Sequence, residues 1–216
     1  SFREAPVLGA CAILTGIGTV RDDDPQLNVR DVATTRQPLR VVVDSKLEMP
    51  LTAKLLGGGP VLVAAAVDDE NRAKLLRVAG AEVLVLPNAA GKVELPALLA
   101  ELARRGINEV HVEAGHKLNG SLLREGLVDE LLLYLAPCLI GHDAAGLFNL
   151  PALAALSDRR RLAISDLRRV GDDIRLLARL QLADEENKGY GFDCAQPSIG
   201  YLISPKAYEP ATDNVL

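Results

Sequence analysis

The stretch that decides the fold is "NEVHVEAGHKLNGSLLREGLVDELLLYLAPCLIG" at residues 108–141. Its first part alternates β-branched and polar residues up to Glu113, which is typical of a strand. Gly115 then marks a turn, and residues 116–126 have the composition of a short helix. A second apolar strand follows within residues 128–141. The order strand, helix, strand predicts one crossover unit of a layered α/β domain.

The rest of the chain repeats this alternation. We predict strands at 38–45, 59–66 and 81–86, and helices at 67–80 and 94–106 that end at Gly80 and Gly106. Two strand-like runs surround "VGDD" within 162–183, which predicts a late β-hairpin. The expected fold is therefore a three-layer α/β domain with a mostly parallel sheet and a C-terminal hairpin.

Composition excludes several classes of protein. The net charge of −5 argues against a general affinity for nucleic acid or for anionic membrane surfaces. No apolar run approaches the roughly 18 residues that a membrane span requires. The three cysteines, Cys11, Cys138 and Cys194, are odd in number and far apart. They imply no disulfide framework and favour a reducing cytoplasm. We expect Cys11 and Cys138 to be small buried residues.

The last part of the chain differs in character. Residues 184–216 contain three of the four tyrosines, Tyr190, Tyr201 and Tyr208, and show no helical periodicity. We predict a domain at 1–183, and a C-terminal extension of unknown role at 184–216 that packs on the domain or on a partner chain.

Residues 108–141 also resemble half of a zinc-deaminase signature. His111 and Glu113 fit its H-x-E part, and Pro137 with Cys138 begin its P-C-x-x-C part. Gly141 stands where the second thiolate is needed, and two ligands do not make a tetrahedral zinc site. We therefore expect no metal. The alternative is a phosphate site, because the amides at a helix N-terminus favour bound anions and Gly115 allows close approach.

A second group of polar residues occurs in "AILTGIGTVRDDDPQLNVR" at residues 12–30. A strand runs into a glycine-containing turn at residues 16–19, and three aspartates, Pro25 and Arg30 follow. The planar guanidinium of Arg30 suits a phosphate, and the aspartates suit sugar hydroxyls. The alternative is a solvated acidic turn that ends at Pro25.

Together these segments resemble a known family. The blocks "TGIGTVRDDDPQLNVR" (15–30), "RVVVDSKLEMP" (40–50), "VEAGHKLNGSLLREGLVDEL" (112–131) and "APCLIGHDAAGLF" (136–148) occur in the order found in the reductase domain of the bacterial riboflavin-biosynthesis deaminase–reductase. That domain is dihydrofolate-reductase-like in fold. The resemblance covers about residues 7–182.

The resemblance implies a role for individual residues. The positions that would line a phosphorylated pyrimidine substrate are Leu27, Arg30 and Glu113. Those that would contact NADPH are Thr19, Asp23, Ser45, Gly115, His116, Lys117, Leu118, Asn119, Gly120 and Ser121. Arg40 and Lys46, on either side of Ser45, are further candidates for neutralising a cofactor phosphate. No residue is assigned as the proton donor.

The implied activity is an NADPH-dependent reduction of 5-amino-6-(5-phosphoribosylamino)uracil to its 5-phosphoribitylamino product, by hydride transfer to the sugar C1. One alternative is the diamino-pyrimidinone phosphate reductase or another reductase of this fold, and a second is a non-catalytic binding module. The family also has a strand and loop before the region where this chain begins, and a zinc deaminase domain upstream. A homodimer is expected, with the apolar strand at 127–137 extending a sheet across two copies.

Overall fold

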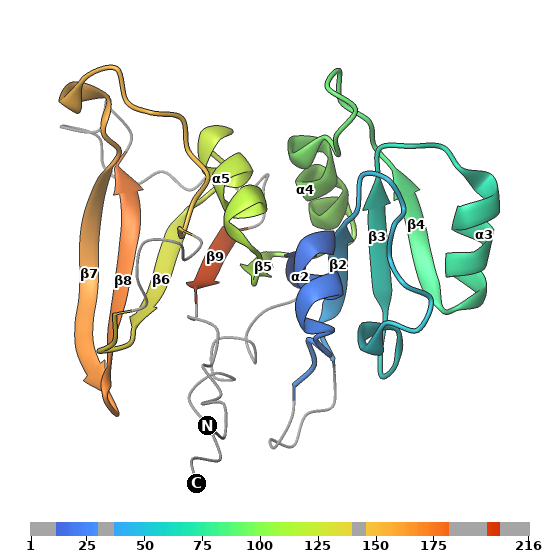
Figure 1. The fold of residues 1–216 in the computed structure, drawn as a ribbon, viewed down its shortest axis with the longest axis horizontal. Helices are drawn as coiled ribbons and strands as arrows, with labels where there is room; N and C mark the ends of the chain where they lie inside the picture. Colours follow the sequence, from blue (N-terminus) through green and yellow to red (C-terminus); the bar gives the residue numbers. More distant parts are fainter. Residues whose placement is uncertain (1–11, 30–36, 140–145, 182–197, 204–216) are drawn as a thin grey trace, which may run out of the picture.

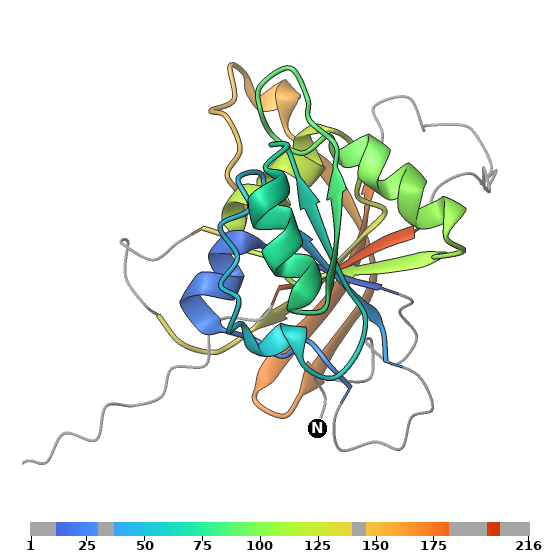
Figure 2. The same cartoon turned by 90° about the vertical axis from the view of Figure 1, so that its right-hand side faces the viewer.

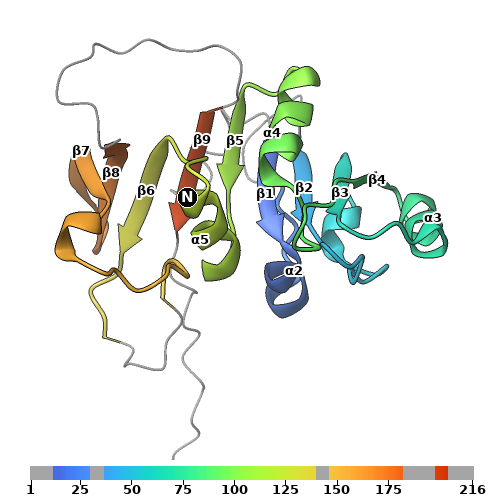
Figure 3. The ribbon, with the colours of Figure 1, turned by 90° about the horizontal axis from the view of Figure 1, so that it is seen from above.

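The structure, a computed structural model, describes residues 12–29, 37–139, 146–181 and 198–203. Its centre is a nine-stranded sheet in the order β4-β3-β2-β1-β5-β9-β6-β8-β7, which can be followed across Figures 1 and 3. The strands are β1 (Ala12–Gly16), β2 (Leu39–Val43), β3 (Val61–Ala65), β4 (Ala81–Val85), β5 (Glu109–Val112), β6 (Glu130–Leu135), β7 (Arg161–Val170), β8 (Asp173–Gln181) and β9 (Ser198–Ile203).

Every neighbouring pair from β4 to β6 is parallel, whereas β6–β8 and β7–β8 are antiparallel. This arrangement confirms the predicted mostly parallel sheet with a C-terminal hairpin. The hairpin turns at Gly171, whose φ of 62° lies in the left-handed region that glycine adopts readily.

Helices cover both faces of the parallel part. They are α2 (Ile17–Asp23), α3 (Glu70–Val78), α4 (Leu95–Arg104) and α5 (His116–Arg124), with short 3-10 turns at Lys54–Leu56 and Leu156–Asp158. Leu62 and Ala64 of β3 belong to the core cluster that includes α4 and α5, and Val63 belongs to the one that includes α2 and α3. Successive residues of a strand point to opposite faces, so the sheet is the middle of three layers, as predicted. Figure 2 shows α3 across the β3–β4 end of the sheet.

The helix ends follow from local chemistry. The side chain of Asp69 accepts the N–H of Arg72 at 3.0 Å, which caps the start of α3. Pro96 lies in the first turn of α4, where a missing N–H costs no helical bond. Gly80 and Gly106 follow α3 and α4 with φ of 99° and 77°, so both predicted helix stops are confirmed.

Residues 17–23 differ from the expected turn, because they form the helix α2. Gly16 is its N-cap, and Val20 is buried in the core cluster with α3. The helix ends at Asp24, which has a φ of 41° and donates its N–H to the carbonyl of Val20 at 3.1 Å. Burial of one apolar side chain therefore outweighs the low helix propensity of a glycine-rich start.

The C-terminal part contributes a strand that the sequence did not predict. Strand β9 lies between β5 and β6, although residues 182–197 separate it from β8 along the chain. The proposed boundary between residues 183 and 184 remains a prediction.

Two further expectations need correction. Strand β6 pairs with β9 on one edge and β8 on the other, so residues 127–137 offer no free edge to extend a sheet across a dimer. Cys138 is exposed rather than buried, because it follows the end of β6. Cys11 lies outside the described residues. In the described part of the chain, the helices are too short and too polar to cross a membrane.

Candidate functional site

The site is positioned by a change of direction in the sheet. From β1 the chain builds β2, β3 and β4 on one side, and it then places β5 on the other side of β1. Ligands of open α/β sheets bind outside the carboxyl ends of the strands at such a point. The carboxyl end of β1 continues directly into α2, and residues 113–115 join the carboxyl end of β5 to α5, so both predicted polar segments meet here.

Hydrogen bonds hold these two strand ends together. The hydroxyl of Thr15, which is fully buried, donates to the main-chain carbonyl of Glu113 at 2.7 Å. The N–H of Glu113 donates to the carbonyl of Leu14 at 2.9 Å. The Glu113 side chain is 30% exposed, so its carboxylate reaches solvent while its main chain is fixed. A partly exposed carboxylate on a fixed strand end can accept hydrogen bonds from a ligand.

The starts of α2 and α5 lie against each other. Gly16 and Gly115 are their N-cap residues, and neither provides a side-chain cap. A methyl group placed on Gly115 would lie 4.0 Å from Oγ1 of Thr19, and one on Gly16 would lie 3.6 Å from Cδ2 of Leu118. The first helical bond of α5 runs from the N–H of Asn119 to the carbonyl of Gly115, at 3.2 Å. The preceding N–H groups of α5 have no place in that ladder and are available to an anion.

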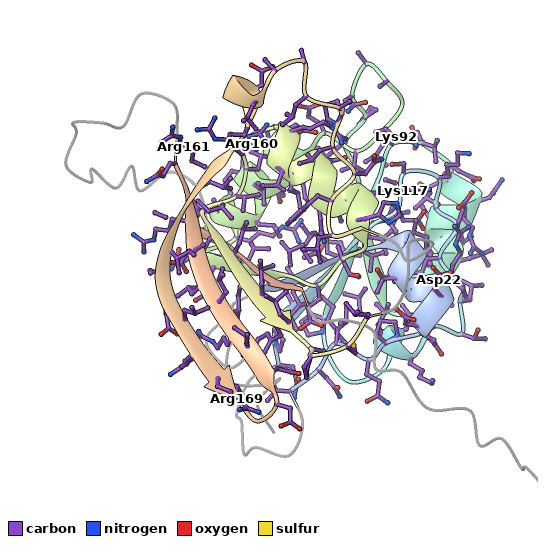
Figure 4. The ribbon with its side chains drawn as sticks, turned by 60° about the vertical axis from the view of Figure 1, so that its left-hand side comes forward. Asp22, Lys92, Lys117, Arg160, Arg161 and Arg169 are labelled. Atoms are coloured by element: carbon purple, nitrogen blue, oxygen red, sulfur yellow. The ribbon has the colours of Figure 1, made fainter. Side chains whose placement is uncertain are left out.

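The residues predicted to form the phosphate turn fall into two groups. Gly115 and Lys117 are exposed, and His116 and Leu118 are partly exposed. Lys117 is labelled in Figure 4. These four residues lie at the start of α5 and are accessible to solvent.

The other three residues make contacts inside the protein. The side-chain amide of Asn119 donates to the carbonyls of Ala114 at 2.9 Å and Leu147 at 3.5 Å. Gly120 packs against the main chain of Asn149, whose N–H donates to the carbonyl of His116 at 2.9 Å. The hydroxyl of Ser121 donates to the carbonyl of Lys117 at 3.1 Å. In this structure these three residues hold the turn and the 147–149 segment in place.

The segment after α2 carries two of the three predicted substrate residues, Leu27 and Arg30. Leu27 has a φ of 48° and packs against Ile13 and Val29. The side-chain amide of Gln37 bonds the N–H of Val29 at 2.9 Å and its carbonyl at 3.2 Å, which fixes this segment beside β2. Arg30 lies outside the described residues.

The acidic run 22–24 is not a uniform solvated turn. The main-chain N–H of Lys54 donates to Asp24 Oδ1 at 2.9 Å and, with the Lys54 ammonium, lowers the pKa of Asp24. Asp23 is exposed at the end of α2. The acidic run therefore anchors the Lys54–Leu56 turn through Asp24.

Ser45 follows the carboxyl end of β2, where its hydroxyl accepts the N–H of Val93 at 3.3 Å. The neighbouring Asp44 is fully buried and accepts the N–H groups of Glu48 at 3.0 Å and Met49 at 2.8 Å. Sequence reasoning missed this anchor. An aspartate directly after a buried strand and before a turn was the signal available for it.

The suggestion that Arg40 helps to neutralise a cofactor phosphate is wrong. Arg40 lies near the amino end of β2, five positions before Ser45 and therefore about 16 Å along the strand direction. Its side chain is 1% exposed and donates to the carbonyl of Gly57 at 2.6 Å. Arg40 therefore stabilises the end of the sheet opposite to the candidate site.

His111 lies beneath the site on β5. It is 4% exposed, and burial lowers its pKa to about 4, so its imidazole is neutral at pH 7. Its Nε2 atom lies 3.7 Å from Oε1 of Glu113. The contact is therefore between a neutral ring and a carboxylate. Across the described ranges, no three His, Cys, Asp or Glu side chains are grouped to hold a metal ion.

Comparison with known proteins shows what the chain is similar to. Residues 8–176 match the family model of the RibD C-terminal domain. The riboflavin biosynthesis protein RibD of Escherichia coli strain K12 is 37% identical over 177 residues, an alignment covering 76% of this chain and 47% of that protein. The chain thus spans about half the length of this relative. The 2,5-diamino-6-ribosylamino-4(3H)-pyrimidinone 5′-phosphate reductase of Archaeoglobus fulgidus is 36% identical over 180 residues, covering 78% of each chain.

Solved structures show the same architecture. The RibD structure of Acinetobacter baumannii matches with a TM-score of 0.68 and 34% identity, over 80% of this chain and 47% of that one. The riboflavin biosynthesis reductase Rib7 of Saccharomyces cerevisiae matches with a TM-score of 0.59 over 81% of this chain and 77% of that one. At 21% identity, that second match supports the fold alone.

Proposed function

The chain belongs to the RibD C-terminal domain family, and from this membership and the site geometry we propose that it is a reductase of riboflavin biosynthesis. The proposed substrate is 5-amino-6-(5-phosphoribosylamino)uracil, and the proposed product is its 5-phosphoribitylamino counterpart. The observation that carries the proposal is the closeness of Thr19 to Gly115, two residues after Glu113, where the chain passes from the carboxyl ends of β1 and β5 into two helices.

The proposed cofactor is NADPH, which would supply a hydride to C1 of the ring-opened sugar. The start of α5 fits a phosphate group, because its first N–H groups lie outside the helical ladder and Gly115 has no side chain to block approach. Lys117 adds a positive charge in the first turn. Thr19 would contact the cofactor from α2. Asp23 and Ser45 are the other two residues outside the α5 turn that would contact it. Asn119, Gly120 and Ser121 would shape the turn.

The substrate would be held by Leu27, Arg30 and Glu113. The carboxylate of Glu113 can accept hydrogen bonds from sugar hydroxyls or from ring N–H groups. The guanidinium of Arg30 suits the 5′-phosphate, and Leu27 offers an apolar surface. The role of the chain is to orient the two ligands, because the cofactor performs the difficult chemical step.

A second candidate is the reduction of 2,5-diamino-6-ribosylamino-4(3H)-pyrimidinone 5′-phosphate. It is supported by the Archaeoglobus fulgidus relative, which bears that reductase name, is 36% identical and is covered over 78% of its length. The two substrates differ at one exocyclic group of the pyrimidine, and both keep the ribose phosphate.

The test is absorbance at the reduced-nicotinamide band with NADPH and each pyrimidine in turn. We expect oxidation with one of them, and Glu113→Gln should reduce kcat/KM about tenfold to a hundredfold, because it removes a charged acceptor. The matched control is Glu109→Gln, at the exposed amino end of the same strand, which should behave as the parent. Failure to oxidise NADPH with either pyrimidine would contradict the proposal.

Other parts of the assignment rest on sequence alone. A cytoplasmic location is expected from the cysteine content. A homodimer remains a prediction, and the strand at 127–137 no longer supports it because both edges of β6 are paired. An upstream zinc deaminase domain in the full-length protein fits the partial coverage of RibD.

A further inference from the structure

Strands β5 and β6 are consecutive along the sequence but are not neighbours in the sheet. The chain passes from β5 through α5 to β6 and leaves one strand position between them. Strand β9, drawn in red in Figure 1, fills that position and is parallel to both. The C-terminal strand therefore lies in the middle of the sheet rather than at its edge.

The register shows that β9 is bonded as an interior strand. Gly200 is paired with His111 on one side and Glu130 on the other. Tyr201 is paired in the same way with Val112 and Leu131. Without β9, the backbones of β5 and β6 would be about 10 Å apart, too far for direct pairing. Their facing N–H and C=O groups would then lack partners.

The sequence of β9 is suited to this position. Residues 198–203 read "SIGYLI", in which β-branched and aromatic residues favour a strand. Pro197 precedes the run and Pro205 follows it closely. Proline has no N–H to give to a ladder, so the prolines set limits to the length of chain that can pair.

The strand also reaches the candidate site. It runs parallel to β5, and Tyr201 is level with Val112, the last residue of β5. Leu202 and Glu113 are the residues that directly follow this pair along the chain. The carboxyl end of β9 lies at the same edge of the sheet as the carboxyl ends of β1 and β5.

We propose that β5 and β6 form a slot for one extended parallel segment, and that residues 198–203 dock in this slot and complete the wall of the site beside Glu113. The effect on activity rests on the proposed function, whereas the docking itself does not. The occupant is this chain's own C-terminal segment.

Amide hydrogen exchange of the full chain tests the docking directly. The N–H groups of residues 200–202 should be protected to the same degree as those of Leu131–Leu133 in β6, because both strands are interior. Exchange of residues 200–202 at the rate of an unstructured peptide would overturn the inference.

A proline variant tests the consequence. Tyr201→Pro removes an N–H from the middle of β9, and Ala211→Pro, beyond the strand, is its control. We expect the amides of β5 and β6 to exchange about tenfold faster or more in Tyr201→Pro, and NADPH oxidation to fall with it. Unchanged exchange in β5 and β6 would overturn the inference.

Two results separate the possible failures. If Tyr201→Pro does not fold, the exchange of the parent's own β9 amides decides the question. If the parent shows protected β9 amides but no NADPH oxidation, the docking stands and the proposed function fails.

Discussion

The Nε2 atom of His111 lies 3.7 Å from the carboxylate oxygen Oε1 of Glu113. The imidazole is buried and the Glu113 side chain is partly exposed. Among the described atoms, Nε2 has no hydrogen-bond partner. A buried polar atom without a partner destabilises the fold, and a charged ring in that place would destabilise it more.

The first prediction concerns acid stability. Burial lowers the pKa of His111 from 6.5 to about 4, so below pH 6.5 the unfolded chain binds a proton that the folded chain does not. Stability from this group is complete above pH 6.5 and is lost as the pH falls towards 4. Over this pH range the free energy of unfolding falls by about 3 kcal/mol. Denaturant unfolding of the parent and of His111→Gln between pH 7 and 4 measures the difference. An equal pH dependence in the two proteins would show that His111 titrates normally.

The second prediction concerns Gly120. A methyl group there would overlap the carbonyl of Asn149 and lie 2.8 Å from its nitrogen. Gly120→Ala should therefore destabilise the protein by about 1–3 kcal/mol, although alanine favours helices. The matched control is Gly18→Ala in α2, where no atom lies within 4 Å and stability should be equal or up to about 1 kcal/mol higher. Thermal unfolding of both variants checks this, and equal stabilities would contradict the packing described for Asn149.

The third prediction concerns the start of α5. Lys117 is exposed in the first turn, so Lys117→Gln should raise the Kd for NADPH about threefold to tenfold, a typical effect of one surface charge near a phosphate. Lys74→Gln, an exposed lysine on α3, removes the same charge away from the site and should leave the Kd unchanged. Titration of NADPH fluorescence at low salt measures both. Equal increases in the Kd from the two substitutions would mean that NADPH responds only to the net charge of the protein, which would contradict a phosphate site beside Lys117.

Much of the fold was accessible from the sequence, because the parallel strands are buried on both faces and read as continuous apolar runs. The run at 59–66 is an example, and it contains β3 (Val61–Ala65). Glycines such as Gly80 and Gly106 gave reliable helix ends, because their positive φ values suit few other residues. Thr19 and Gly115, which the family resemblance assigns separately to the cofactor, lie close together in the structure.

Other features depend on contacts that no local pattern contains. Strand β9 pairs with residues about 70 to 90 positions earlier in the chain, so its register is set by the slot between β5 and β6. The burial of Val20 makes α2 a helix despite its glycines. The internal roles of Asn119 and Gly120 depend on the 147–149 segment, which is remote in sequence.

The most direct test of the proposed reaction follows the hydride itself. The chain is supplied with 5-amino-6-(5-phosphoribosylamino)uracil and NADPH that carries deuterium at both hydrogens of the nicotinamide C4, and the product is examined by mass spectrometry and NMR. The proposal predicts one deuterium at C1 of a ribityl chain, with one NADP⁺ formed per product. Consumption of NADPH without deuterium at that carbon, or no ribityl product at all, would contradict the proposed function.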